Sequence, residues 1–552
     1  MGLNKEAATL VVRNAKIYTV DARRPWASAL AVKNGRFHTI GSAEDVEPFI
    51  GTETDVVDAG GRLVLPGLLD SHCHAFEGAR ELLFELRLSP MDDLPALLDK
   101  ARAAASTLGS GQWLTGGGWN ARSLISELSR PPSLRLLDEA TGDRPTVLRD
   151  TTRHVVFANT AAMQAAGLLS GGATVGEDDA IRYEDGTLAG VFLEGGCGLV
   201  ERAIPPLSDD RRRQSALHAA ALYNSLGVTG FTHAVTSEAT MRTFKELDDA
   251  GALTVWIATC IATDTAIVPD YDGVGDVAIG RRAAYRSDHV AVDFVKYFMD
   301  GVPGARTAAF ERPYEKEADG SVRHARPLYT VAELRDRILP HDAAGLHVKI
   351  HTVGDQAIHD ALEAIEQVRK ANGPGPLHSL AHAGHVRDSD IPRFAQLNVM
   401  ADFCPPYWFP CPVQQSSLQI LGQARAGRSW AIADIVKSGA LTAFGTDWPV
   451  VATPSPWRGL AGIVTRKDPS GAIPGVFRPD QALSLEQALR LCTINVAESM
   501  GFGRDTGSIS EGKSADFIVL DQDLFAVAPE KIAETQVLNT YFAGRLVHQA
   551  AA

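Results

Sequence analysis

The stretch LVLPGLLDSHCH, residues 63–74, is an apolar run that ends in two histidines separated by one residue. Such a run is typical of a strand buried in a parallel sheet. Successive side chains of a strand point to opposite faces, so His72 and His74 project from the same face. Two imidazoles at the end of one strand can chelate a divalent metal, although two polar residues at a loop mouth would give the same pattern.

Seven more strand-like runs follow along the chain and alternate with helical patterns, which indicates βαβ units and a parallel sheet. Eight such units predict an α/β fold, a (β/α)8 TIM barrel, whose active site lies at the carboxyl ends of the strands. The seven later candidate strands are residues 227–235, 253–261, 292–300, 346–355, 378–386, 398–406 and 441–449.

Both ends of the chain are rich in short β-strand patterns, with Asn34-Gly35 as a hairpin turn. We therefore expect residues 1–65 and 505–552 to form one small β-sandwich domain beside a barrel over 66–504. Residues 76–215, after the first barrel strand, are too many for a simple βα loop. They predict an inserted cap subdomain over one face of the barrel, where substrate would bind.

The composition is that of a soluble globular protein, with 552 residues, 45% hydrophobic and 22% charged. The formal net charge of −14 disfavours nucleic acid and anionic lipid as partners. No apolar run is long enough to span a bilayer, and six scattered cysteines do not form a disulfide framework. We expect a cytoplasmic enzyme with a small-molecule substrate. The sequence leaves open whether the enzyme forms a homo-oligomer.

Four more residues with metal-binding chemistry lie near the carboxyl ends of different candidate strands: Lys296, His351, His382 and Asp447. A barrel would bring these positions into one cavity, and imidazole and carboxylate are typical ligands of zinc. Alternatives stay open at each position. His382 could instead be a buried core histidine with its hydrogen bonds satisfied, and Asp447 could cap the following helix. A buried lysine is costly without a partner, so Lys296 is either in an ion pair or a carboxylated ligand.

This order of ligands resembles the amidohydrolase superfamily, and the details resemble its third family, the YtcJ-like and N-substituted formamide deformylase-like metal-dependent hydrolases. The resemblance covers nearly the full chain. It is carried by PGLLDSHCHAF, VKYFMDGVPGARTAAF, IHTVGDQAIHDAL, AHAGHV followed by DIPRF, GTDWPV and GSISEGKSADFIVLD.

The resemblance implies a role for each residue. His72 and His74 would bind the more buried metal, Lys296 as N-carboxylysine would bridge two metals, and His351 with His382 would hold the second. Asp447 would contact the activated water and act as general base, then as proton donor to the leaving group. The resemblance implies one or two divalent metals, zinc above all.

One segment departs from the family pattern. The family often has Glu before the histidine of strand six and Gln shortly after it, whereas this chain has Ala381 and Gly384 around His382. The groups that support the ligand therefore differ. His385 is a further candidate there for binding substrate.

The remaining candidates for substrate binding are aromatic or charged. An aromatic wall is predicted from Trp119, the run Tyr407-Trp408-Phe409 and Trp448, although aromatics more often pack in cores. Polar contacts to substrate are expected from His154, Glu194 and Arg306, for which an exposed surface position is the alternative. Together they predict a largely apolar cavity with few polar anchors for a small, mostly uncharged amide rather than a nucleotide or a protein.

The expected function is metal-dependent hydrolysis of a non-peptide carbon–nitrogen bond. Two alternatives remain: hydrolysis of an ester, lactone or carbamate at the same site, and a non-catalytic regulator built on a hydrolase barrel.

Overall fold

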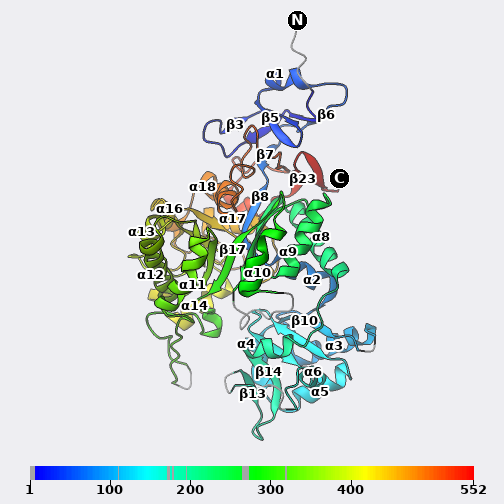
Figure 1. The fold of residues 1–552 in the computed structure, drawn as a ribbon, viewed down its shortest axis with the longest axis vertical. Coiled ribbons are helices and arrows are strands. Elements are labelled where there is room, and N and C mark those ends of the chain that lie inside the picture. The colour runs from blue at the N-terminus through cyan, green and yellow to red at the C-terminus, as the bar shows by residue number, and fades with distance from the viewer. Residues whose placement is uncertain are drawn as a thin grey trace.

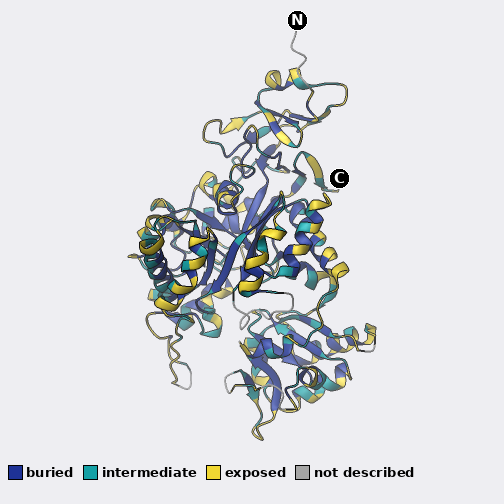
Figure 2. Ribbon diagram, in the orientation of Figure 1, coloured by how far each residue is buried: buried dark blue, intermediate teal, exposed yellow. Residues whose placement is uncertain are grey.

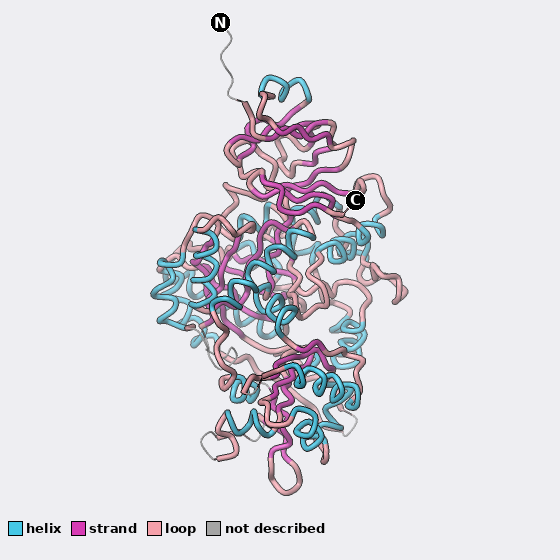
Figure 3. The backbone as a smooth tube through the Cα atoms, turned by 90° about the vertical axis from the view of Figure 1, so that its right-hand side faces the viewer, coloured by secondary structure: helices cyan, strands magenta, loops and turns pink. Residues whose placement is uncertain are grey.

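The computed structural model describes residues 7–109, 111–170, 174–176, 179–193, 195–263, 273–317 and 320–551. In Figure 1 a barrel of strands and helices occupies the middle of the molecule, with a β-rich part at one end and a part with both helices and a sheet at the other. Figure 3, turned by 90°, shows the same three parts in the same order. Within the described residues, no helix has both the length and the apolar character needed to cross a membrane.

The barrel is an eight-stranded parallel sheet in which the strands follow one another in chain order. This confirms the predicted (β/α)8 architecture. Its strands are β8 (Leu68–Cys73), β15 (Val228–Thr236), β16 (Trp256–Ala262), β17 (Val290–Phe298), β18 (His347–Thr352), β19 (His378–His382), β20 (Val399–Phe403) and β21 (Thr442–Phe444).

Helices surround the barrel and cover its apolar strands. The covering helices are α8 (Asp209–Ser225), α9 (Glu238–Asp249), α10 (Gly275–Arg281), α11 (Val331–Ala343), α12 (Asp355–Asn372), α13 (Ile391–Gln396), α16 (Ile432–Lys437) and α18 (Leu485–Leu491). Figure 2 shows the strands buried and the outer faces of the helices exposed, as the amphipathic pattern requires. The largest hydrophobic core lies between these two layers.

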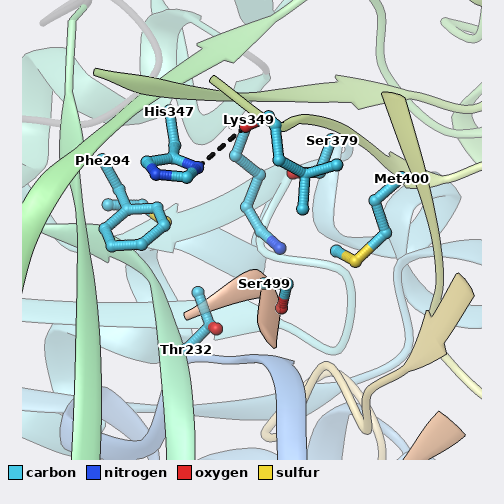
Figure 4. A pocket seen from close by; sticks show the side chains of 9 residues that line it. Thr232, Phe294, His347, Lys349, Ser379, Met400 and Ser499 are labelled. Carbon is cyan, nitrogen blue, oxygen red and sulfur yellow. Dashed lines mark hydrogen bonds between the residues drawn. The ribbon is translucent and has the colours of Figure 1, made fainter. Parts of the chain in front are cut away.

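The barrel interior is packed rather than open. Figure 4 looks into a space of only about 20 Å³ inside it, where side chains from β15, β17, β18, β19 and β20 converge. His347 lies at this level and contacts the carbonyl of Leu377 at 2.8 Å. Filling by side chains in this way makes the barrel a core and confines open space to its ends.

The run 63–74 forms two strands rather than the single strand expected from its sequence. Leu63–Pro66 is β7, which pairs with β22 (Phe517–Leu520) near the other end of the chain, and β8 begins at Leu68. Gly67 separates them at a point where a Cβ atom would collide with the hydroxyl of Thr229. The chain therefore crosses from one sheet to the other through a contact that only glycine permits.

The two chain ends meet in two sheets at one end of the molecule. One sheet has the order β24-β23-β22-β7-β2-β3 and the other the order β5-β4-β1-β6. The Asn34-Gly35 turn is confirmed: it joins β4 to β5, and both residues have positive φ, 51° and 73°. The strands not yet given are β1 (Leu10–Arg13), β2 (Lys16–Tyr18), β3 (Trp26–Ala27), β4 (Ala29–Lys33), β5 (Arg36–Gly41), β6 (Asp55–Asp58), β23 (Val537–Phe542) and β24 (Arg545–Gln549).

The insertion lies at the opposite end of the barrel and has its own mixed sheet, ordered β13-β14-β12-β11-β10-β9. Helix α2 (Ala75–Phe84) leads into it directly after His74, and α8 leads back to the barrel. The sheet comprises β9 (Leu86–Arg87), β10 (Leu114–Trp119), β11 (Thr146–Asp150), β12 (Val155–Ala158), β13 (Ala180–Arg182) and β14 (Leu188–Leu193), with helices α3 (Leu94–Thr107), α4 (Ala121–Leu128), α5 (Ser133–Thr141), α6 (Thr160–Ala165) and α7 (Gly195–Glu201).

The barrel closes where the residues after β21 meet β8. The backbone N–H of Asp447 donates to the carbonyl of His72 at 2.7 Å. The buried carboxylate of Asp70 accepts hydrogen bonds from the backbone N–H of His72 and from both the N–H and the hydroxyl of Thr446. At Gly445 a Cβ atom would lie 2.5 Å from the backbone nitrogen of His72. The first and last strands thus meet at backbone distance.

We predict that Gly445→Ala destabilises the protein by about 1–3 kcal/mol, because the added methyl group overpacks this junction. Denaturant unfolding of the two proteins measures the difference. Gly280→Ala is the matched control, since Gly280 lies in α10 and no atom lies within 4 Å of the position that its added methyl group would take. That control should be neutral or stabilising by up to about 1 kcal/mol. Equal effects of the two substitutions would contradict the prediction.

Candidate metal centre

The six predicted metal-site residues meet at the carboxyl end of the barrel and line one cavity. His72 lies in β8 and His74 directly follows that strand, while Lys296, His351 and His382 belong to β17, β18 and β19. Asp447 lies three residues after β21. His382 and Asp447 both have positive φ, 77° and 57°, a conformation that is uncommon outside glycine and asparagine and that tends to cluster at functional sites.

A first group of metal-binding atoms comprises His72, His74 and Asp447, which lie within 4.8 Å of one another. One oxygen of Asp447 is 3.6 Å from Nε2 of His72 and 3.4 Å from Nε2 of His74. Burial, together with the charges of Lys296 and Lys349, holds the pKa of His72 well below its usual value. His72 is therefore neutral, the form in which imidazole binds a metal.

The carboxylate of Asp447 is ionised. Burial opposes ionisation, but the contact with His74 and the neighbouring His72 and His382 lower the pKa of Asp447 to about 2. A buried carboxylate beside several imidazoles has the charge and the atoms that a divalent cation needs.

His351 and His382 form a second group. Nδ1 of His382 contacts the carbonyl of Cys404 at 2.9 Å, and Nε2 of His351 contacts the carbonyl of Gly301 at 3.2 Å. Because a carbonyl only accepts, each of these nitrogens carries the proton. The two remaining ring nitrogens, both with lone pairs, then face each other at 2.9 Å. Facing lone pairs repel unless a cation lies between them, so this geometry fits a metal ion.

Cys404 adds a sulfur to this region. Its Sγ lies 3.4 Å from Nδ1 of His382, and it forms another possible metal-binding group with His72 and His382. Since Nδ1 of His382 already faces a carbonyl, the arrangement favours the pair made by Nε2 of His382 and Nδ1 of His351.

Lys296 differs sharply from the neighbouring Lys349. Lys349 donates to Asp402 at 2.5 Å and to the carbonyl of Ser71 at 3.0 Å. Lys296 is equally buried but forms no ion pair with any residue that the structure describes; its Nζ lies 5.0 Å from the centre of the Phe298 ring. Burial and the charge of Lys349 lower the pKa of Lys296 to about 8. Of the alternatives considered for Lys296, the ion pair is thus not found.

Asp402 on β20 is a supporting residue that the sequence analysis missed. Its carboxylate lies 3.3 Å from Nδ1 of His72, accepts from Lys349 and accepts a short hydrogen bond from Ser71. The contact with His72 Nδ1 leaves Nε2 of His72 directed toward Asp447. A charged residue within the apolar run 398–406 was the signal available in the sequence.

The cavity has a volume of about 1240 Å³ and lies between the barrel and the insertion. Of the predicted substrate-binding residues, His154 and His385 line it. His385 packs edge-on against Phe310, with 5.1 Å between ring centres, and burial and the charge of Arg425 lower the pKa of His385 to about 4. Glu194 lies outside the described residues.

The predicted aromatic wall is wrong except at Tyr407, which lines the cavity. Trp119 is buried in the core of the insertion, where its indole donates to the carbonyl of Leu148. Trp408 donates to the carbonyl of Gly459 within the barrel core, and Trp448 is buried against Gly78. All three satisfy the usual tendency of tryptophan to pack in cores, and none lines the cavity. Phe409 is also buried in the barrel core and does not line the cavity, whereas Trp430, which the sequence analysis did not single out, does.

Arg306 also does not line the cavity. Its guanidinium donates to the carbonyl of Glu315 at 2.9 Å and lies 3.7 Å from the carboxylate of Glu317. The prediction that the cavity has few polar anchors is wrong as well. Five arginines line the cavity: Arg80, Arg149, Arg153, Arg211 and Arg212.

The family model for the amidohydrolase family matches residues 55–548 of this chain. The chain therefore belongs to the amidohydrolase family, which confirms the resemblance found in the sequence.

Known relatives cover nearly the whole chain. The chain is 27% identical to N-substituted formamide deformylase of Arthrobacter pascens, over 98% of each protein. It is 26% identical to the putative amidohydrolase YtcJ of Bacillus subtilis, over 97% of this chain and 98% of that protein. A solved structure of an uncharacterized metal-dependent hydrolase from Pyrococcus horikoshii has the same fold, with a TM-score of 0.76 at 23% identity over 94% of this chain and 99% of that one.

We predict that Asp402→Asn lowers metal affinity about 10–100-fold, because the substitution removes the negative charge beside His72 and the partner of Lys349. Competition with a metal chelator measures the affinity. Asp390→Asn is the matched control: Asp390 is equally buried and contacts a histidine, His359, at 3.1 Å, but it lies outside the cavity. An unchanged affinity in Asp402→Asn, or an equal loss in the control, would contradict the supporting role of Asp402.

Proposed function

We propose that the protein is a metal-dependent hydrolase of a non-peptide carbon–nitrogen bond in a small organic amide. The observation that carries the proposal is the pair of facing lone pairs on His351 and His382, beside the separate group made by His72, His74 and Asp447. Membership of the amidohydrolase family and the relative named as a formamide deformylase support it. Zinc suits the imidazole and carboxylate atoms of both groups.

Two groups of metal-binding atoms would suit two metals, and Lys296, as a carbamate in the same cavity, would be the ligand shared by both. An ammonium group has no atom that can accept or bind a cation. Addition of the neutral Lys296 amine to carbon dioxide forms an N–C bond and releases one proton, which gives a carbamate with two oxygens. The absence of an ion pair around Lys296 in the described residues leaves its buried charge uncompensated, and carbamate formation would remove that charge.

When bound, a divalent cation would polarise the scissile carbonyl and make water acidic enough to ionise near neutral pH. Asp447 is placed to take the proton of the attacking water, because its carboxylate lies at the cavity wall beside His72 and His74. It then returns the proton to the leaving nitrogen, which cannot depart as an anion. His385, neutral and directed toward the cavity, is placed to hydrogen-bond the substrate.

The same groups can hydrolyse esters, lactones and carbamates, because water attacks all of these carbonyls in the same way. A regulator without catalytic activity is disfavoured, since none of the six predicted metal-site residues is missing and all six face one cavity.

The proposal predicts that the metal-loaded protein hydrolyses members of an amide panel, including N-substituted formamides, and loses this activity when a chelator removes the metal. Asp447→Asn should lower turnover about 10²–10⁴-fold while most of the metal is retained, because an amide cannot take the proton. Elemental analysis and rate measurements on amides, esters and lactones check both statements. Faster hydrolysis of esters than of amides would favour the alternative bond class, and a metal-free, inactive protein would favour the regulator.

Lys296→Ala should lower metal occupancy, and a short-chain acid supplied with bicarbonate should restore part of it. Labelled bicarbonate should also give a carbamate carbon signal in the metal-loaded wild type that the variant lacks. Lys370→Ala, at an exposed position on α12, should change neither measurement. A bare amine at Lys296 beside two fully occupied metals would refute the bridging role.

A further inference from the structure

One wall of the cavity is built from guanidinium groups. Arg80 projects from α2, which begins directly after His74. Arg149 projects from β11, and Arg153 from the turn after it. All three line the same cavity as the metal-site residues. The wall therefore faces the place where substrate would lie, and it supplies more polar anchors than the sequence predicted.

Neighbouring glutamates hold these arginines in place, and one of the arginines keeps an unused donor. Arg149 contacts Glu85 at 3.0 Å and Glu201 at 2.5 Å, and Arg80 shares Glu85 at 3.0 Å. The Nε of Arg80 is buried and has no hydrogen-bond partner among the described residues. An unpartnered guanidinium N–H inside a cavity is costly unless a ligand accepts from it.

Arg153 is held in an unusual conformation. Its φ is 65°, in the left-handed region, and the carboxylate of Asp150 fixes the turn by accepting from the N–H of Val155 and the hydroxyl of Thr152. Its guanidinium forms a short ion pair with Glu81 through one nitrogen. Backbone strain that a buried carboxylate maintains, and that aims a side chain into a cavity, is a feature of binding sites.

Arg153 and the metal-site residues line the same cavity, so one substrate can contact both. After burial, the charges that act most on it are those of Arg80, Glu77, Glu201 and Asp447, and the net result is that the pKa of Arg153 falls to about 10. The mutual repulsion of Arg80 and Arg153 is relieved when an anion binds between them. A group bound by Arg153 would thus belong to the same molecule whose carbonyl lies near Asp447.

We propose that the substrate carries a carboxylate, which Arg153 binds through two parallel hydrogen bonds with help from Arg80. Guanidinium matches a carboxylate geometrically, and charge-assisted pairs of this kind are among the strongest hydrogen bonds. The inference rests on the proposed function, since it names the substrate class of the same site.

The charges around the wall favour a single negative charge over a larger one. Glu77, Glu81, Glu85 and Glu201 lie around the three arginines, so a doubly charged phosphate would meet four carboxylates as well as the guanidinium groups. A monoanionic carboxylate gains the hydrogen bonds with less repulsion.

The test compares 4-acetamidobenzoate with 4-acetamidobenzamide, which have the same shape and differ in charge. Calorimetric binding to the metal-loaded protein in an Asp447→Asn background, where turnover is low, should favour the carboxylate. Arg153→Gln should weaken binding of the carboxylate about 10–100-fold and leave the neutral compound unchanged. Arg153→Lys keeps the charge and loses the paired geometry, so its affinity for the carboxylate should lie between those of the wild-type arginine and Arg153→Gln.

Arg182→Gln is the matched control, because it removes the same charge from an exposed position in the insertion. Metal content and thermal unfolding show whether each variant is folded. Equal affinity for the two compounds, no detectable binding of the carboxylate, or an equal loss in Arg182→Gln would overturn the inference. Hydrolysis of amides without a preference for the carboxylate would support the proposed function and overturn the carboxylate inference. Arg153-dependent binding of the carboxylate without hydrolysis of any amide would support the carboxylate inference and overturn the proposed function.

Discussion

The junction between β8 and the residues after β21 is the contact on which the rest of the site depends. A barrel exists only if its first and last strands meet, and here they meet through Asp70, whose carboxylate binds the backbone of both segments. The same few residues carry His72, His74 and Asp447. Closing the barrel and assembling the first group of metal-binding atoms are therefore one event. This is why the backbone hydrogen bond between Asp447 and His72 is as important as any side-chain contact.

Two buried lysines lie beneath the metal-site residues, and only one of them has its charge balanced by a carboxylate. Lys349 and Asp402 neutralise each other inside the barrel, directly below His72, so no net charge remains at that level. Lys296 one strand away has no such partner among the described residues, and its charge is the one that the site must accommodate. Two lysines of similar burial thus differ in their electrostatic surroundings, because Asp402 of β20 supplies a carboxylate to Lys349, whereas no described residue forms an ion pair with Lys296.

The residues that could be predicted from the sequence were those whose position along a strand determines where they point. His72, His351 and Asp447 each end an apolar run, and strand periodicity with barrel topology is enough to bring them together. The three tryptophans could not be placed in this way, because an aromatic residue beside a site packs equally well into the core behind it. Trp119 shows this clearly, since its indole finds a carbonyl partner within the insertion. Charged networks were also beyond the reach of the sequence, because Asp402 and Arg153 contact residues that lie far away in the chain. The one local signal in that wall, the positive φ of Arg153, is visible only once the backbone is known.

The insertion enters after α2 and leaves through α8, two helices that pack against each other on the barrel. None of the metal-site residues comes from the segment between them, although that segment supplies much of the cavity wall. The metal-site residues and part of the recognition surface, including Arg149 and Arg153, are thereby encoded in separate stretches of the gene, while Arg80 and His385 lie outside that segment. Substitutions within residues 86–193 can therefore alter which substrate is bound while the metal-site residues stay the same.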